Sequence, residues 1–415
     1  MKLHDDPPVH LTYCLNIHPG ERWDENVAAI RDHALRVRNA VAPDRAFGLG
    51  LRLGREAAEE LSRPARLEQF RDFLRTNGLY VFTINGFPYG RFHGMAVKAD
   101  VYRPDWRSDE RRDYTLRLID ILAALLPDGV TGSISTVPGA YKPWIRAEQD
   151  VEAMARRLAE TAARAAEVLD RTGRDICIAL EPEPDCYVET TDQAVEFLTG
   201  ALPAVGAPIV AERLGISADA AAGALARHVG VCFDTAHAAV QFESPPDSLR
   251  RLASAGVRVG KVQLSAALRL TAGEEALRRL EDFADEVYLH QVRLRRPDGP
   301  IEAHADLPEA LAAARAAAAE TELRVHFHVP LFFEGAGGLH STADLLDNEF
   351  WSVLLGWPGQ AARAVEHLEI ETYTFDVLPD EIRPADVADS IAREYEWVLA
   401  AVRRAGGRGW GGECG

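Results

Sequence analysis

The chain has 415 residues, 46 of them basic and 64 acidic, so its formal net charge is −18. A field of this sign repels phosphate backbones, which argues against nucleic acid as a partner. Hydrophobic residues make up 47% of the chain. They form no uninterrupted apolar run of 18 residues, so no membrane span is expected.

The first residues, Met1 to Pro8, lack the apolar segment of a secretory signal, and we predict a cytoplasmic protein. The five cysteines include no CxxC pair, which favours reduced, buried thiols over disulfides. The sequence does not predict an oligomeric state.

Seven apolar runs with β preference follow one another along the chain, and a helical pattern comes after each. The predicted strands span residues 10–16, 46–53, 79–85, 130–136, 175–181, 228–234 and 257–264. Strands that alternate with helices are typical of βαβ units and a parallel sheet. Because no GxGxxG or GxxxxGK[ST] motif follows a strand, a (β/α)8 TIM barrel fits better than a nucleotide-binding fold.

Three further strand candidates, 286–293, 322–328 and 366–373, complicate the count, since eight strands close a barrel and ten do not. We therefore expect two of them to form an inserted excursion between strands seven and eight. Residues 384–405 are predicted to form the closing helix. On this interpretation residues 1–405 are one TIM-barrel domain, and 406–415 are a disordered Gly-rich tail.

The carboxyl ends of the predicted strands carry polar side chains, and in a barrel these ends form one ring at its mouth. The ring would hold His18, Asn85, Thr136, Glu181, Asp234, His237, Gln263, His328 and Glu371. Several buried carboxylates do not all stay ionised without a cation, so a divalent metal (Mn, Co, Fe, Mg or Zn) is expected among them. The alternative is that each is a single polar residue satisfied by a loop or an arginine.

Other candidates are less direct. His326 and His328 alternate with Phe327 and so share a face, which is unusual for buried imidazoles. His290 is as readily explained as a core histidine, and His18 as part of a turn before the first helix. The aromatic loop after the third strand, with Phe87 and His93, is either a substrate wall or a hydrophobic lid.

The motifs resemble those of a known group of barrels. Glu181, Asp234-x-x-His237, a polar residue ending strand seven and Glu371 resemble the xylose-isomerase-like TIM barrel superfamily. More narrowly, 11-LTYC-14, 16-NIHPGERW-23, 132-GSISTVP-138 and 326-HFHVP-330 resemble EboE-type metabolite traffic proteins, which bacterial ebo clusters encode.

The resemblance implies that Glu181, Asp234 and Glu371 bind a metal and that His237 contacts substrate. It departs at strand seven, where the epimerases carry histidine and this chain has Gln263. Either Gln263 coordinates the metal or His328 replaces it. Asn85, Phe87, His93, His290, His326 and His18 are the predicted substrate-binding residues.

Three functions follow as hypotheses. The first is a metal-dependent isomerase or epimerase of a small polyhydroxylated metabolite, a sugar or cyclitol, in which Glu181 and Glu371 move a proton and His237 assists. It would belong to a secondary-metabolism cluster. The second is a non-catalytic metabolite carrier. The third, an endonuclease-IV-like phosphoesterase, is disfavoured by the net charge of −18.

Overall fold

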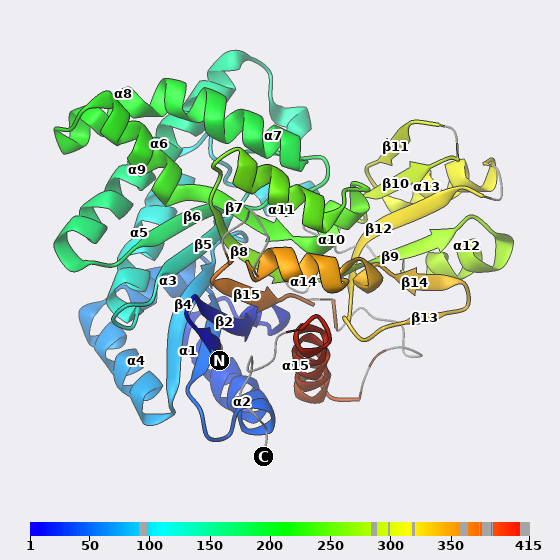
Figure 1. The fold of residues 1–415 in the computed structure, drawn as a ribbon, viewed down its shortest axis with the longest axis horizontal. Helices are drawn as coiled ribbons and strands as arrows, with labels where there is room; N and C mark the ends of the chain where they lie inside the picture. Colours follow the sequence, from blue (N-terminus) through cyan, green and yellow to red (C-terminus); the bar gives the residue numbers. More distant parts are fainter. Residues whose placement is uncertain are drawn as a thin grey trace.

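The computed structural model of the protein describes residues 1–90, 98–283, 289–297, 299–317, 320–356, 364–372, 374–375, 383 and 385–406. Its larger sheet is a nearly closed barrel of nine strands (Figure 1). The strands of this sheet are β1 (Lys2–Asp5), β2 (Pro8–Tyr13), β3 (Phe47–Arg52), β4 (Leu79–Asn85), β5 (Gly132–Thr136), β6 (Ile176–Leu180), β7 (Val229–Asp234), β8 (Val259–Leu264) and β15 (His367–Ile370).

Eight of these strands, β2 to β8 and β15, run parallel to their neighbours, and β1 pairs antiparallel with β2. Between β2 and β3 the barrel closes through a single parallel bridge, Cys14 to Gly50, and the Thr12 hydroxyl donates to Gly48 O at 2.8 Å. Glycine is needed at Gly50, because an added Cβ would lie 2.8 Å from Tyr13 O and collide with Glu369. The predicted (β/α)8 fold is confirmed.

Most of the described helices surround the barrel, and two lie beside a second sheet (Figure 1). They are α1 (Trp23–Ala29), α2 (Leu35–Val41), α3 (Arg55–Leu61), α4 (Pro64–Thr76), α5 (Asp109–Leu125), α6 (Glu148–Thr172), α7 (Thr191–Glu196), α8 (Leu202–Leu214), α9 (Ala218–His228), α10 (Thr235–Val240), α11 (Pro245–Ser254), α12 (Glu274–Leu280), α13 (Leu307–Arg315), α14 (Asn348–Leu354) and α15 (Val387–Arg404). The last of them, α15, packs against α2 and α14 and completes the ring.

A second sheet is built by the chain between β8 and β15 and projects to one side of the barrel with α12 and α13 (Figure 1). Its strands are β9 (Ala266–Thr271), β10 (Val292–Arg295), β11 (Ile301–His304), β12 (Glu322–Val329), β13 (Gly335–Ala336) and β14 (Leu339–Ser341), all antiparallel. Of the three late strand candidates, the run 366–373 contributes β15 to the barrel. The other two contribute β10 and β12 to the second sheet.

The barrel interior contains a buried ion pair. Lys261 on β8 and Glu369 on β15 are fully buried, and their side chains are 2.5 Å apart. Burial alone would lower the pKa of Lys261, but the neighbouring Glu369 carboxylate raises it above its ordinary value. Removing one partner of such a pair leaves an uncompensated buried charge, which destabilises the fold. Lys261 and Glu369 therefore stabilise the barrel as a pair.

The described cysteines, Cys14, Cys177, Cys186 and Cys232, are buried free thiols, as predicted, and Cys414 lies outside the described residues. One helical run in the described chain, Thr191–Leu214, is long and apolar enough by length and composition to cross a membrane, with a mean hydropathy of 1.6. Core helices of globular proteins pass the same test, and α8 in this run packs against α6 and α9.

Candidate metal centre at the barrel mouth

Asp234 ends β7, a strand whose six residues are all buried, and it also caps α10. Its Oδ1 accepts hydrogen bonds from the backbone N–H groups of Ala236 and His237, at 2.7 and 2.9 Å, and from the Ser265 hydroxyl at 2.7 Å. Its Oδ2 is buried and accepts no hydrogen bond. The Asp-x-x-His spacing thus fixes the carboxylate with one oxygen and presents the other.

Glu181 and Glu371 follow directly after β6 and β15. The backbone N–H of Glu181 donates to Thr136 O at 3.1 Å, and that of Glu371 to Leu264 O at 3.1 Å, so both residues continue the sheet pattern of their strands. Glu371 Oε1 accepts from Asn16 Nδ2 at 2.6 Å and from Asn85 Nδ2 at 3.3 Å. By contrast, the buried Glu181 Oε2 accepts no hydrogen bond.

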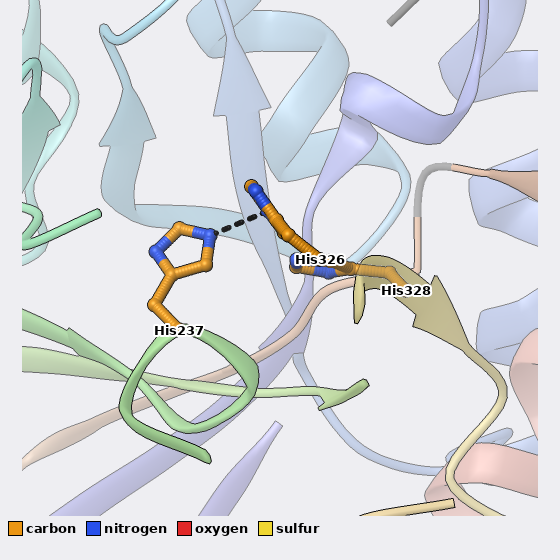
Figure 2. A group of neighbouring side chains, drawn as sticks. All are labelled: His237, His326 and His328. Carbon is orange, nitrogen blue, oxygen red and sulfur yellow. Dashed lines mark hydrogen bonds between the residues drawn. The ribbon is translucent and has the colours of Figure 1, made fainter. Parts of the chain in front are cut away.

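Three histidines join these carboxylates. His237 lies in α10, while His326 and His328 lie on one face of β12 in the second sheet (Figure 2). Ligand atoms lie within 4.8 Å of one another in three overlapping groups: Glu181 with Asp234 and His237, Asp234 with His328 and Glu371, and the three histidines. The site therefore contains residues from the barrel and from the second sheet.

The carboxyl groups perturb one another because they are buried together. Burial, followed by the charges of Asp234 and Glu183, raises the pKa of Glu181 well above its usual value. Burial, followed by Glu181 and Asp234, does the same to the pKa of Glu371. Burial also acts to raise the pKa of Asp234, but His237, His328 and its hydrogen bonds outweigh it and hold that pKa low.

These shifts in pKa show that burial and mutual repulsion oppose the simultaneous ionisation of all three carboxyl groups. A divalent cation would let all three ionise, because its charge offsets their mutual repulsion. The residues fit such an ion: two buried carboxylate oxygens have no hydrogen-bond donor, and carboxylate and imidazole ligands suit Mn, Co, Fe or Zn.

A cavity opens above this group. Its walls carry Asn16, Asn85, Phe87, Pro88, Lys98, Val101, Tyr102, Glu181, Glu183, His237, Leu289, Gln291, His326 and Glu371. Of the predicted site residues, the structure places Glu181, Glu371, His237, His326, Asn85 and Phe87 on these walls. Asp234 and His328 do not line the cavity, but each has a possible ligand atom within 4.8 Å of one on Glu371.

Three predicted residues lie elsewhere. Gln263 is buried inside the barrel, where its Oε1 accepts from the Cys232 thiol at 2.9 Å. His18 stacks on His33, with ring centroids 4.3 Å apart, and its Nε2 is 3.0 Å from the Tyr13 hydroxyl. Neither Gln263 nor His18 lines the cavity.

His290 is the third of these residues, and it does not line the cavity either. Its ring stacks on that of Phe327, with the ring centroids 5.4 Å apart. The predicted His93 lies outside the described residues.

Sequence reasoning missed three lining residues that form one hydrogen-bonded wall. The Tyr102 hydroxyl donates to Glu183 Oε1 at 2.8 Å and accepts from Gln291 Nε2 at 3.0 Å. Burial raises the pKa of Glu183 to about 8, although the hydrogen bond from Tyr102 opposes that effect. Glu183 was detectable, since Glu181-Pro-Glu183 repeats a carboxylate just past a strand end. Tyr102 ends a short helical turn, and Gln291 lies in the predicted strand 286–293, where nothing marked it as a site residue.

No protein-family model matches the sequence, and no curated protein does. Among solved structures, a xylose isomerase domain protein from Planctomyces limnophilus is similar at 12% identity and a TM-score of 0.50, over 96% of this chain and 97% of that chain. An L-ribulose 3-epimerase matches at 12% identity and a TM-score of 0.47, over 95% of both chains.

The IOLI protein, solved with a bound zinc atom, matches at 11% identity and a TM-score of 0.45, over 96% of this chain and 99% of that chain. The likeness to the xylose isomerase domain protein from Planctomyces limnophilus shows that this chain shares the fold of that protein.

Proposed function

We propose that the protein binds a divalent cation between Glu181, Asp234, Glu371 and His328 and catalyses proton transfer at a carbon of a small polyhydroxylated molecule. The observation that carries this proposal is a pair of buried clusters that share Asp234, one with Glu181 and one with Glu371. Glu181 and Asp234 each have a buried oxygen that accepts no hydrogen bond. Such an arrangement is costly to bury unless a cation is shared.

We assign the fourth ligand to the imidazole of His328 rather than to the amide of Gln263. Its ring belongs to a group with Asp234 and Glu371. Its Nδ1 lies 2.9 Å from Glu371 O, a carbonyl that only accepts, so the neutral ring carries its hydrogen on Nδ1 and its lone pair on Nε2. A metal-bound histidine is oriented by such a hydrogen bond. Gln263 has its amide oxygen engaged by Cys232.

A bound cation would polarise two neighbouring oxygens of the substrate and so acidify the C–H bond next to a carbonyl. One carboxylate removes this proton while the electron pair of the C–H bond moves toward the carbonyl oxygen. The other carboxyl group returns a proton to carbon. Glu371, which Asn16 and Asn85 hold in place, and Glu181, whose Oε2 has no donor, are the two groups positioned to do this.

The cavity lining indicates an uncharged, hydroxyl-rich ligand. Asn16, Asn85, Tyr102 and Gln291 offer amide and hydroxyl groups, and Phe87 offers an apolar face. Lys98 is the one lysine or arginine among the described lining residues, and it already pairs with Asp306 at 2.7 Å. The described lining therefore offers a phosphate group no lysine or arginine without a carboxylate partner, which favours an unphosphorylated sugar or cyclitol.

The test is solvent-proton exchange. Metal-loaded protein is incubated in deuterium oxide with a panel of ketopentoses, ketohexoses and inososes, and deuterium at carbon is followed by mass spectrometry. At least one compound should exchange, and Glu181→Gln and Glu371→Gln should each lose the exchange about 100-fold or more. Glu243→Gln, a half-buried glutamate bonded to Thr191 outside the cavity, is the matched control and should keep it.

Absence of exchange across the panel in fully metal-loaded protein would contradict the catalytic proposal. If such protein still bound one of these compounds, the carrier hypothesis would replace it. The EboE-type role in a metabolite cluster and the cytoplasmic location stay predictions from the sequence.

A further inference from the structure

The side chains of His237 and His326 face each other at the edge of the cavity. Their Nε2 atoms are 3.0 Å apart, their ring centroids 4.5 Å apart, and the rings are nearly perpendicular, at 83° (Figure 2). Both residues are buried, with exposed fractions of 4% and 5%. The chemistry of this contact depends on which ring nitrogens carry hydrogen.

The tautomer of His237 follows from its other nitrogen. Nδ1 lies 3.0 Å from the carbonyl oxygen of Pro182. A carbonyl oxygen only accepts, so the hydrogen of the neutral ring is on Nδ1. The Nε2 atom that faces His326 therefore carries a lone pair.

The tautomer of His326 follows from a longer chain of hydrogen bonds. Gln291 Nε2 is 3.2 Å from Pro184 O, which only accepts, and this contact fixes the orientation of the amide. Gln291 Oε1 then faces His326 Nδ1 at 2.7 Å, so that Nδ1 carries the hydrogen. The Nε2 atom of His326 also carries a lone pair.

Two lone pairs that face each other at 3.0 Å repel unless a cation lies between or beside them. A proton shared by two nitrogens is one such cation, and a metal ion is the other. Three features favour the metal. Each Nδ1 donates to an oxygen acceptor, which is the usual arrangement of metal-bound histidines. A third imidazole, His328, lies within 4.8 Å of both.

The third feature is the spacing. Two nitrogens bound at right angles to one six-coordinate ion, each at about 2.1 Å, lie about 3.0 Å from each other. This is the separation that the two Nε2 atoms have. It is short for two unprotonated nitrogens and ordinary for neighbouring ligands of one ion.

We propose that His237 and His326 bind a second metal ion, distinct from the ion of the carboxylate site. Its ligand atoms are imidazole nitrogens, so it favours Zn, Co, Ni or Fe over Mg or Ca. Both histidines line the cavity, so its remaining coordination positions face the ligand and suit a hydroxyl or carbonyl oxygen. The inference stands independently of the proposed function, because the lone-pair contact involves none of the carboxylates.

Zinc titration of chelator-stripped protein by calorimetry tests this inference, with stoichiometry confirmed by mass spectrometry of metals. Wild type should bind two ions per chain. His326→Ala and His237→Ala should each bind one, with at least a tenfold loss of affinity at the second site. His340→Ala removes an exposed histidine of the same second sheet and should bind two.

Glu371→Gln separates the two sites. It should lose or weaken the carboxylate-site ion and keep the ion that depends on His326. If wild type bound one ion, lost in Glu371→Gln and unchanged in His326→Ala, the second site would be overturned and the proposed function kept, and a shared proton would explain the contact. If the single ion were lost in His326→Ala and kept in Glu371→Gln, the inference would hold and the carboxylate site would fail.

Because a lost imidazole can also unfold a protein, the melting temperature of each metal-free variant is compared with that of metal-free wild type. As a second variant, Gln291→Leu leaves both histidines in place and removes the acceptor that fixes the His326 tautomer. It should lower the affinity of the second ion about 10- to 100-fold and leave the first unchanged. An unchanged second affinity would contradict the tautomer argument.

Discussion

Asp234 shows how one residue can serve both the fold and the site. One carboxylate oxygen accepts two backbone N–H groups at the start of α10, while the other has no hydrogen-bond donor. The cap fixes His237 in the first turn of the same helix, three residues away. This double use explains why an aspartate and a histidine at that spacing could be recognised in the sequence as one unit.

The choice between His328 and Gln263 is tested by a matched pair of substitutions. His328→Ala removes a nitrogen grouped with Asp234 and Glu371, so the affinity for Mn²⁺ should fall about 100-fold or more. Gln263→Met keeps the volume of a side chain whose oxygen is bonded to Cys232, and it should change that affinity less than about threefold. Calorimetry on stripped protein gives both values. A loss in Gln263→Met with none in His328→Ala would reverse the assignment.

At the level of elements, the sequence predicted the barrel well because its parallel strands are buried on both faces. Continuous apolar runs such as Val229 to Phe233 reveal such strands without any knowledge of their partners. The strand ends then followed from position alone, which is why Glu181, Asp234 and Glu371 could be predicted together.

The second sheet was harder to predict because its pairing is distant in sequence. β9 was missed altogether: it begins two residues after β8 ends, and its partner β12 comes about 50 residues later. Gln291, which lines the cavity, lies inside the predicted strand 286–293 but just before the observed β10, and nothing in that run marked it as a site residue. Contacts of this kind are set by tertiary packing and are not visible in a local pattern.

Helix α15 connects the two elements that deliver His328 and Glu371. Glu394 Oε1 accepts from Leu331 N at 3.1 Å, just after β12, and from the Thr372 hydroxyl at 2.7 Å, just after β15. The Thr374 hydroxyl also donates to His328 O. A single buried carboxyl group therefore ties the closing helix to both strand ends.

The pH dependence of stability tests this tie. Burial raises the pKa of Glu394 from 4.5 to about 7, although its two hydrogen bonds oppose the shift. The folded state binds the Glu394 proton more tightly than the unfolded state does. The stabilisation that this proton provides is therefore complete below pH 4.5 and is lost as pH rises to about 7. The shift corresponds to about 3 kcal/mol.

Glu394→Gln keeps an acceptor oxygen and does not titrate. Between pH 5 and pH 8 the variant should therefore gain up to about 3 kcal/mol in unfolding free energy relative to wild type. Urea unfolding at both pH values measures the difference. Glu396→Gln, an exposed glutamate on the same helix, is the control and should show no such gain. Parallel pH profiles for wild type and Glu394→Gln would contradict the assigned protonation.

Over the whole molecule, the site combines two architectures. The barrel contributes the carboxylates at the ends of β6, β7 and β15, and the second sheet contributes His326 and His328 from β12 (Figures 1 and 2). The hydrogen bond from His328 Nδ1 to Glu371 O joins the two parts at the site itself. Metal binding is therefore expected to stabilise the docking of the second sheet onto the barrel.

The central claim, that the barrel mouth binds a divalent metal, is tested most directly by the metal content of the purified protein. Inductively coupled plasma mass spectrometry is applied before chelator treatment, after it, and after reloading with Mn, Co, Fe, Mg or Zn. Wild type should carry at least one divalent ion per chain, lose it to the chelator and regain it on reloading. The Asp234→Asn, Glu371→Gln double variant should lack the carboxylate-site ion throughout. A wild type that carries and regains no divalent ion would contradict the account.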